Sequence, residues 1–351
     1  MNILLVIRRF DFGGAENHVC ELANDLHRRG HKVIVTGRRG RQVKKLHPEI
    51  RFIHKSFRDY FLPLHVVWMV FLILRHGVEL IHAHQRLPIL ISTLAGFFTR
   101  RKIVATVHGR ARYDMRNYLV RRLAHRIVFV SKAVQCYAEK RYNIKHKTVY
   151  IPNGLVASDY PHDPVHYRIC YASKISRNHY KFLEMMVDRV IPRLLGVYPH
   201  LEFVIIGDGR MMEDLVEMAY ELNQRYRKTI CTVEGYRSDL RSCYGSASLV
   251  MGVGRVALEA SAGGVPVMLI NGKRMGGMLT HKNYVTVKEN NFIDVTARLP
   301  DEDAAYDLVT LFFENQEACR TMARELATHI REDFRMTEIV GQIEELYTTL
   351  K

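Results

Sequence analysis

Short apolar runs alternate along this chain with segments whose apolar residues recur at helical spacing. The run NILLVI is followed by a stripe of apolar residues one helical turn apart, namely Ala15, Val19, Leu22, Ala23 and Leu26. The runs KVIVT, ELIHA, KIVATV and RIVFVS continue the series, with helical stretches between most of them. Because alternating strands and helices build parallel sheets with right-handed crossovers, the sequence predicts an α/β fold.

The alternation stops at residues 148–167, where Pro, Gly, Asn and Asp accumulate as they do in interdomain linkers, and restarts with RICYAS. A chain of 351 residues is also longer than one core usually supports. We therefore expect two doubly wound domains, residues 1–160 and 161–333, joined near Asp159 and followed by a helix at 334–351. Ligands of such sheets bind beyond the carboxyl ends of the strands, so the expected site is the interdomain cleft that the two domains face.

The basic residues are concentrated in the first domain. Residues 1–165 hold 29 of the 52 Lys and Arg but only 11 of the 36 Asp and Glu. Each basic cluster by itself reads as a solvated face, but their concentration in one half predicts an anionic partner. Nucleic acid, a phospholipid surface and a phosphorylated substrate all satisfy this condition.

Several classes of protein are not supported. The six cysteines are scattered without a C-x-x-C pair, so neither a zinc nor a redox motif is indicated. The N-terminal run MNILLVI is followed by arginines and reads as a first strand rather than a signal peptide. The apolar run at residues 61–74 is shorter than the roughly 20 residues of a membrane span, and we expect a buried core helix there.

The segment MGVGRVALEASAGGVPV, residues 251–267, is a candidate anion site. Gly252 and Gly254 flank Val253 between a strand and a helix that begins near Arg255 and contains Glu259. Glycines let a ligand approach the backbone closely, and the first N–H groups of a helix attract negative charge. An ordinary tight turn explains the same residues equally well.

Other strand ends also carry candidate residues. Gly13 and Gly14 follow the first strand without the spacing of a dinucleotide fingerprint, and His108 ends the run TVHG, where a structural histidine is the alternative. The cations Lys174, Arg177 and Lys181 follow RICYAS and suit a diphosphate, although a surface loop of mixed charge is the alternative. Two further strands end at Gly207 and Gly235.

Taken in order, the strings GGAE, HAH, TVHG, VSKAV, IPNG, VIIGDG, VEGY and GVGRVALEASAGGVPV closely resemble those of family 4 glycosyltransferases of the GT-B fold, from Met1 to the C-terminal helix. The resemblance implies retaining transfer of a sugar from a nucleotide-diphosphate sugar, UDP- or GDP-linked, with no metal or other cofactor. It also implies that the C-terminal helix packs back onto the first domain.

The resemblance implies roles for the candidate residues. Gly13 and Gly14 would form the loop beside the donor's diphosphate and sugar, and His108 would lie at the donor sugar. Lys174 and Lys181 would neutralise the leaving diphosphate, with Arg177, Gly207 and Gly235 as further donor-site residues. The amides from Gly252 through Val253 and Gly254 to Arg255 would hold phosphate, and Glu259 would bind the ribose.

Three positions depart from the family pattern. Met251 stands where the first of the family's two paired glutamates is expected, eight residues before Glu259, and this departure affects recognition of the donor sugar. Lys174 replaces an arginine and lacks its bidentate fork, while Lys181 is displaced by about two positions, which makes Arg177 a substitute. Arg255 replaces an apolar residue and adds a possible phosphate contact.

Metal sites are not predicted. The DED string at residues 301–303 matches the Asp-x-Asp of metal-dependent transferases, but it precedes AAYDLVTLFF and reads as the acidic opening of a helix. His82 and His84 share one face of a strand without an evident third ligand.

These observations lead to one functional hypothesis and two alternatives. We expect a cytosolic glycosyltransferase whose basic first domain rests on the inner membrane face, where it glycosylates a lipid-linked or cell-envelope saccharide such as lipopolysaccharide. A catalytically idle GT-B protein that acts as a binding partner is the first alternative. A nucleic-acid binder is the second, although the chain has no recognisable nucleic-acid motif.

Overall fold

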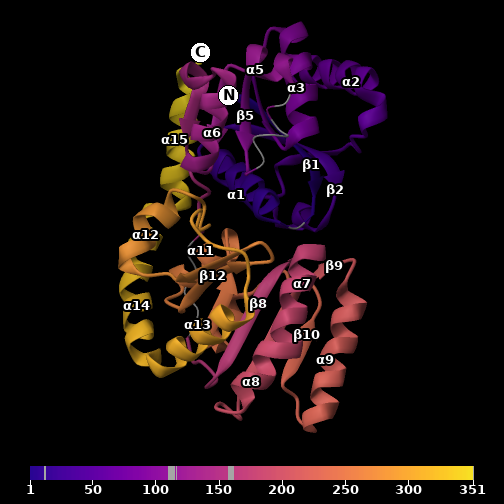
Figure 1. Cartoon of the computed structure of the whole chain (residues 1–351). Helices are drawn as coiled ribbons and strands as arrows, with labels where there is room; N and C mark the ends of the chain where they lie inside the picture. The colour runs from indigo at the N-terminus through magenta and orange to yellow at the C-terminus, as the bar shows by residue number, and fades with distance from the viewer. Residues whose placement is uncertain (12, 110–114, 116, 157–161, 351) are drawn as a thin grey trace. The chain divides into compact units, whose positions relative to one another are not determined.

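The computed structural model describes residues 1–11, 13–109, 115, 117–156 and 162–350. The chain divides into two compact units (Figure 1). Unit 1 comprises Met1–Val156 and Phe334–Lys351, and unit 2 comprises Ala157–Asp333. Asp159, near which we expected the linker, lies outside the described residues.

Unit 1 is built on a seven-stranded parallel sheet of order β3-β2-β1-β4-β5-β6-β7. The strands are β1 Asn2–Phe10, β2 Lys32–Arg39, β3 Arg51–His54, β4 Leu80–His84, β5 Lys102–Val107, β6 Arg126–Phe129 and β7 Thr148–Tyr150. The central strands β1, β4 and β5 are buried along almost all of their length because helices cover both faces. Strand order reverses between β1 and β4, where doubly wound sheets bind ligands.

Two separate cores lie on the two faces of this sheet. One packs under α2 (Leu62–Arg75), α3 (Arg86–Thr99), α5 (Tyr118–Leu123) and α6 (Lys132–Tyr142). The other packs under α1 (Gly14–Arg28) and the C-terminal helix α15 (Met336–Thr348), which lie against each other. The last helix of the chain is therefore part of the first unit.

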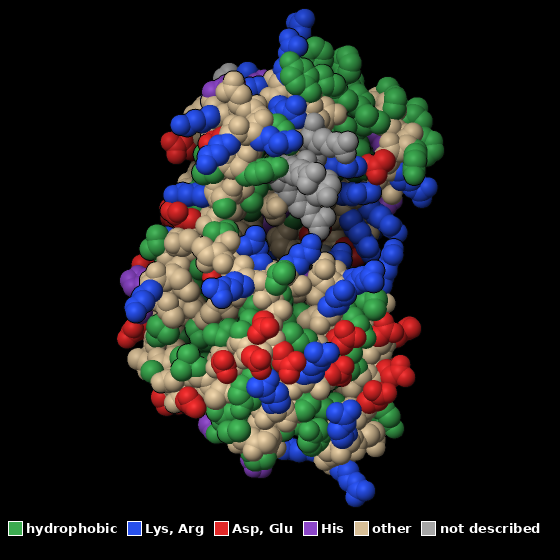
Figure 2. Space-filling model, in the orientation of Figure 1, with side chains coloured by type: hydrophobic (Ala, Val, Ile, Leu, Met, Phe, Trp, Pro, Cys, Tyr) green, Lys and Arg blue, Asp and Glu red, His purple; other side chains and the backbone are tan. Residues whose placement is uncertain are grey.

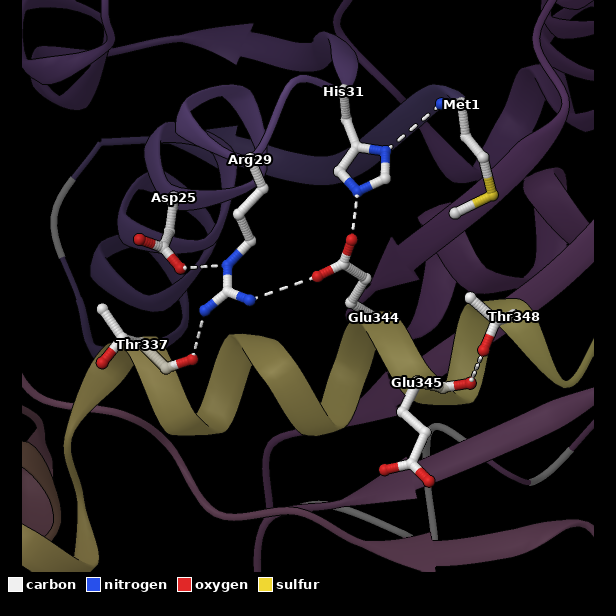
Figure 3. A network of polar contacts seen from close by, with 8 residues as sticks. All are labelled: Met1, Asp25, Arg29, His31, Thr337, Glu344, Glu345 and Thr348. Carbon is white, nitrogen blue, oxygen red and sulfur yellow. Dashed lines mark hydrogen bonds and ion pairs between the residues drawn. The ribbon is translucent and has the colours of Figure 1, made fainter.

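Polar contacts join α15 to the first unit (Figure 3). The guanidinium of Arg29 donates to Asp25 at 2.9 Å, to Glu344 at 3.2 Å and to the carbonyl oxygen of Thr337 at 2.5 Å. His31 contacts the other oxygen of Glu344 at 2.8 Å. Hydrogen bonds from these two partners hold the pKa of Glu344 below its usual range.

Unit 2 contains a six-stranded sheet of order β10-β9-β8-β11-β12-β13. Its strands are β8 Arg168–Ile175, β9 Glu202–Gly209, β10 Cys231–Glu234, β11 Leu249–Gly252, β12 Val267–Asn271 and β13 Arg274–Met278. The prediction of two parallel α/β sheets is confirmed, but β13 is an antiparallel edge strand that the sequence did not indicate. Strand order reverses between β8 and β11.

The helices of unit 2 are α7 Arg177–Met185, α8 Ile191–Leu195, α9 Met212–Tyr226, α10 Arg241–Ser246, α11 Arg255–Ala262, α12 His281–Lys288, α13 Glu302–Glu314 and α14 Gln316–Asp333. A π-helical turn, Met186–Val190, joins α7 to α8. The acidic triplet opens α13 as predicted, because the Asp301 side chain accepts from the backbone N–H of Ala304.

The apolar run at residues 61–74 forms α2, but the expectation that it is buried was only half right. One side of α2 packs on the sheet and the other is exposed. Among the described residues, no helix has both the length and the apolarity needed to cross a bilayer.

Candidate functional site

The turn between β11 and α11 has the geometry of an anion site. Gly254, at φ 61° and ψ −131°, occupies a conformation open to glycine and strained for other residues. No side chain caps the start of α11, which begins at Arg255. The helix therefore presents its positive end without a side-chain cap at the carboxyl end of a central strand.

An ion pair occupies the first two turns of α11. Arg255 Nε donates to Glu259 Oε1 at 2.6 Å, and only 13% of the arginine side chain and 27% of the glutamate side chain are exposed. A cation in the first turn of a helix is opposed by the helix dipole and adds to its attraction for anions. The pair thus orients a carboxylate and places a guanidinium beside the glycine turn.

The predicted cations of unit 2 lie along the same edge of the sheet. Tyr171 of β8 is paired with Met251 of β11, so Lys174 and Gly254 are each three residues beyond that pair. Lys174 is exposed near the end of β8, and Arg177 begins α7. Lys181, also exposed, follows one helical turn later on α7. The structure therefore brings the basic segment and the glycine turn to the β8–β11 switch point of the sheet.

Arg241 is a further cation that the sequence analysis missed. It begins α10, and its pKa is raised above the usual value chiefly by its hydrogen bond with Asp239 and to a smaller extent by the negative charge of Glu259. No sequence pattern placed Arg241 near Glu259, because eighteen residues separate them.

Two predicted glycines have different surroundings. A Cβ at Gly207 would lie 2.1 Å from the carbonyl oxygen of Ser173, so this glycine allows β9 to lie close to β8. Gly235 is exposed, with open space where a Cβ would be, and follows β10 at the edge of the sheet. Backbone packing therefore explains Gly207 without a ligand, whereas no packing contact accounts for Gly235.

Met251, at the position of the absent glutamate, is fully buried in β11. It belongs to the core cluster of unit 2, together with Tyr171 of β8 and Met268 of β12, its partners in the sheet register. The thioether therefore contributes to the core, and an unpaired carboxylate in the same place would lose its hydration.

In unit 1, Gly13 and Gly14 lie where α1 begins. Gly13 has φ 144°, and a Cβ there would lie 2.4 Å from Oε2 of Glu16. Gly14 is the first residue of α1, which has no side-chain cap. Gln85, which was missed, follows β4 at φ 68° and donates to Glu16 Oε1 at 2.9 Å. The β1–β4 switch point thus has an uncapped helix start with a glutamine and a glutamate beside it.

His108 follows β5 and belongs to a cluster of histidines. Its Nε2 lies 3.0 Å from Nδ1 of His84, and the His18 ring packs edge-on at 5.6 Å between ring centroids. Burial lowers the pKa of His108 to about 4 and that of His82 to about 3, so both rings are neutral at pH 7. His108 is therefore a hydrogen-bonding group rather than a cation.

His82 was a weak metal candidate, but it has a structural role instead. It lies 2.6 Å from both the Tyr347 hydroxyl and the Thr106 hydroxyl. Within the described part of the chain, three potential metal-ligand atoms come within 4.8 Å of one another only at His27, His47 and Glu49, in an exposed cluster. That cluster is remote in the fold from the carboxyl edge of either sheet, because His27 lies in the last turn of α1.

Two doubly wound sheets, each with a glycine-containing helix start at its switch point, are the defining architecture of the GT-B class of glycosyltransferases. Solved structures of this class match nearly the whole chain. The Anabaena protein HepE in complex with UDP-glucose has a TM-score of 0.77 at 20% identity, covering 99% of this chain and all of that one. A glycosyltransferase from Rickettsia africae has a TM-score of 0.74 at 19% identity, covering 99% and 98%.

Family models match both units. Residues 12–158 match Glycosyltransferase Family 4, and residues 166–300 match Glycosyl transferases group 1. The chain is therefore a glycosyltransferase of the GT-B fold composed of these two domains.

Two curated relatives are similar over most of this chain. The gpi3 subunit of phosphatidylinositol N-acetylglucosaminyltransferase from Schizosaccharomyces pombe is 27% identical over 73% of the chain and 62% of the relative. A human protein, which is named as a subunit of phosphatidylinositol N-acetylglucosaminyltransferase too, is 26% identical over 64% of the chain and 52% of the relative. The matched region thus spans just over half of the length of each relative.

Proposed function

We propose that this protein transfers a sugar, with retention of configuration, from a UDP-sugar to a lipid-linked acceptor at the cytosolic face of a membrane. The observation that carries the proposal is the uncapped start of α11, with Arg255 and Glu259 in its first two turns, at the same sheet edge as the cations after β8. UDP is the preferred nucleotide because HepE, a structural neighbour, was solved with UDP-glucose.

The donor site follows from the chemistry of a nucleotide diphosphate. The backbone from Gly252 to Arg255 receives phosphate oxygens at the positive end of α11. Glu259 accepts hydrogen bonds from the ribose hydroxyls, as a carboxylate does most strongly with neutral donors. Lys174, Arg177 and Lys181 supply the remaining positive charge around the diphosphate.

The reaction needs stabilisation of the leaving group more than it needs a protein nucleophile. The bond between the sugar's anomeric carbon and the diphosphate oxygen breaks as the acceptor oxygen bonds to that carbon from the same face. The acceptor's proton passes to the departing diphosphate, whose growing charge is stabilised by fixed cations and helix N–H groups. These cations take the part that a divalent metal plays in other transferases, so we propose a metal-independent reaction.

His108 suits a position beside the donor sugar because it is neutral. A neutral imidazole donates one hydrogen bond and accepts another, which matches sugar hydroxyls. Gly13 and Gly14 allow the backbone at the start of α1 to approach the donor closely.

The lipid acceptor is supported by two observations. Both curated relatives are named for transfer of N-acetylglucosamine to phosphatidylinositol. The excess of Lys and Arg in residues 1–165 suits an anionic membrane surface. We therefore propose N-acetylglucosamine as the first sugar to test and an inositol phospholipid as the first acceptor.

The first test is a thermal-shift panel of UDP, GDP, ADP, TDP and CMP with their matching sugar nucleotides. Wild type is compared with Glu259→Ala and with Glu217→Ala, a control that removes an exposed carboxylate from α9. We expect UDP to stabilise wild type and the control but not Glu259→Ala. If no nucleotide stabilises wild type, the proposed donor site is wrong.

Transfer itself is then measured with labelled UDP-N-acetylglucosamine and detergent-solubilised phosphatidylinositol, with and without EDTA. The anomeric configuration of the product is read by NMR. An inverted product would contradict the proposed mechanism, and loss of activity in EDTA would contradict metal independence. Nucleotide binding without turnover on any lipid acceptor would instead identify an idle GT-B binding protein.

A further inference from the structure

Helix α2 is apolar on both of its sides, although only one side faces the core. Leu64, Val67, Phe71 and Leu74 form a stripe along the outer side, and each is between 59% and 67% exposed. The inner side is buried on the sheet. From residue 61 to residue 74 the only ionisable side chain is that of His65, which lies on the buried side. An isolated apolar residue on a surface is ordinary, but a continuous stripe of four indicates a contact surface.

Neighbouring elements extend this stripe. Helix α3 packs beside α2, and α5 packs beside α3. The extended surface, here called the α2 face, consists of the exposed residues Tyr60, Phe61, Leu64, Val67, Phe71, Leu74, Phe97, Phe98, Tyr118 and Leu119. Figure 2 shows hydrophobic side chains gathered over this part of unit 1, with Lys and Arg side chains beside them.

Positive charge accompanies the α2 face. Residues 60–138 contain twelve Lys and Arg but only two acidic residues, Glu79 and Asp114. The guanidinium of Arg75 lies 5.9 Å from the centre of the Phe71 ring, and that of Arg121 lies 5.8 Å from the centre of the Tyr118 ring. Exposed aromatic rings with guanidinium groups next to them suit the boundary between lipid headgroups and acyl chains.

We propose that the α2 face is a membrane-docking surface that inserts its apolar side chains into the outer layer of an anionic phospholipid bilayer. Helix α2 has fourteen residues, which is too short to cross a bilayer but sufficient to lie in its interface. The cations contact lipid phosphates while the stripe displaces headgroup water. This inference deepens the proposed function and rests on it for the lipid acceptor.

Charge favours lipid over a protein partner as the occupant. A protein interface that buries this face must leave the surrounding arginines solvated or supply matching carboxylates. An anionic bilayer supplies dense negative charge and an apolar layer together, and each Lys or Arg near its surface adds to the affinity.

The test uses vesicles of phosphatidylcholine alone and with one third phosphatidylserine. Val67→Gln with Phe71→Gln removes two side chains from the middle of the stripe without adding charge. The control, Val216→Gln with Tyr220→Gln, makes the same change at the same spacing on α9, where both side chains are also exposed. Because the replaced residues are exposed in both variants, we expect both to fold.

We expect wild type and the control to sediment with anionic vesicles and to bind less as salt rises. The α2 variant is expected to bind at least about tenfold more weakly, since burying one large apolar side chain is worth roughly a factor of ten or more. Trp68, on α2, is the only tryptophan of the chain. Quenching of its fluorescence by spin-labelled lipids therefore reports whether α2 itself enters the bilayer.

Equal vesicle binding by wild type and the α2 variant would overturn the proposal, as would absence of vesicle binding by wild type. A wild-type dimer that becomes monomeric in the α2 variant would assign the face to a second copy instead. The UDP thermal shift is measured on the same samples, so loss of docking with a normal shift separates failure of this inference from failure of the donor site.

Discussion

Replacing Arg255 by leucine tests whether the ion pair of α11 serves the nucleotide. The arginine donates to Glu259 at 2.6 Å, and the low exposure of both side chains protects the pair from solvent screening. A leucine at this position restores the apolar residue that is usual in similar sequences. It removes a positive charge next to the proposed phosphate site and the donor that orients the proposed ribose ligand.

The expected loss follows from the exposure of the pair. Fully exposed ion pairs contribute about 0.2–1 kcal/mol, whereas hydrogen bonds to charged groups contribute about 1.5–3 kcal/mol. This pair lies between those cases, so we expect about 1–2 kcal/mol of lost UDP binding. That corresponds to a Kd roughly 5–30 times higher.

Calorimetric titration with UDP and with uridine separates the two effects. If Arg255 acts on the diphosphate alone, only UDP binding weakens. If it positions Glu259, uridine binding weakens too, and combining Arg255→Leu with Glu259→Gln costs less than the sum of the single changes. The matched control is Arg168→Leu, which breaks a similar pair with Glu202 at the amino end of β8. An unchanged UDP affinity in Arg255→Leu would refute the reasoning.

Three further outcomes are expected. Tyr347→Phe should lower the free energy of unfolding by about 1–3 kcal/mol, because His82 loses a buried partner 2.6 Å away; urea denaturation measures this, and no change would contradict the role of that contact. As the pH falls from about 6.5 towards 4, stability should drop by up to about 1.4 kcal/mol per pH unit for each of His82 and His108, because burial depresses both pKa values in the folded state and the unfolded chain takes up the protons first; denaturation at several pH values checks this, and His108→Asn should remove one proton from the slope. Gly207→Ala should destabilise unit 2 by more than about 1 kcal/mol, because its Cβ would meet the carbonyl oxygen of Ser173; a stable variant with weakened UDP binding would instead favour a ligand role.

Much of the fold was predictable because it depends on local periodicity. Strand and helix patterns identified both sheets, and the turn residues around position 160 separated the two halves of the chain. The antiparallel strand β13 was missed because Arg274–Met278 contains two glycines and no alternation of apolar and polar residues. Its pairing with β12 is a tertiary contact that no local pattern encodes.

The candidate site was predictable only in part. Glycine turns and cations at strand ends were visible in the sequence, since loops beyond parallel strands carry function. The neutral state of His108 and the neighbourhood of Arg241 were not visible, because burial and distant charges determine both. Gly207 resembled a ligand residue in sequence, but its packing against β8 gives it a structural explanation as well.

The sequence by itself determined the fold class, the placement of candidate residues at strand ends and the uneven distribution of charge, because each depends on residue type and spacing. Only the tertiary structure decided which candidates share a sheet edge, since strand order sets that and β8 lies beside β11 although about eighty residues separate them. It also decided that one side of α2 remains exposed. An apolar helix has no pattern of its own to distinguish a buried side from an exposed one, so packing against α3 and the sheet made that choice.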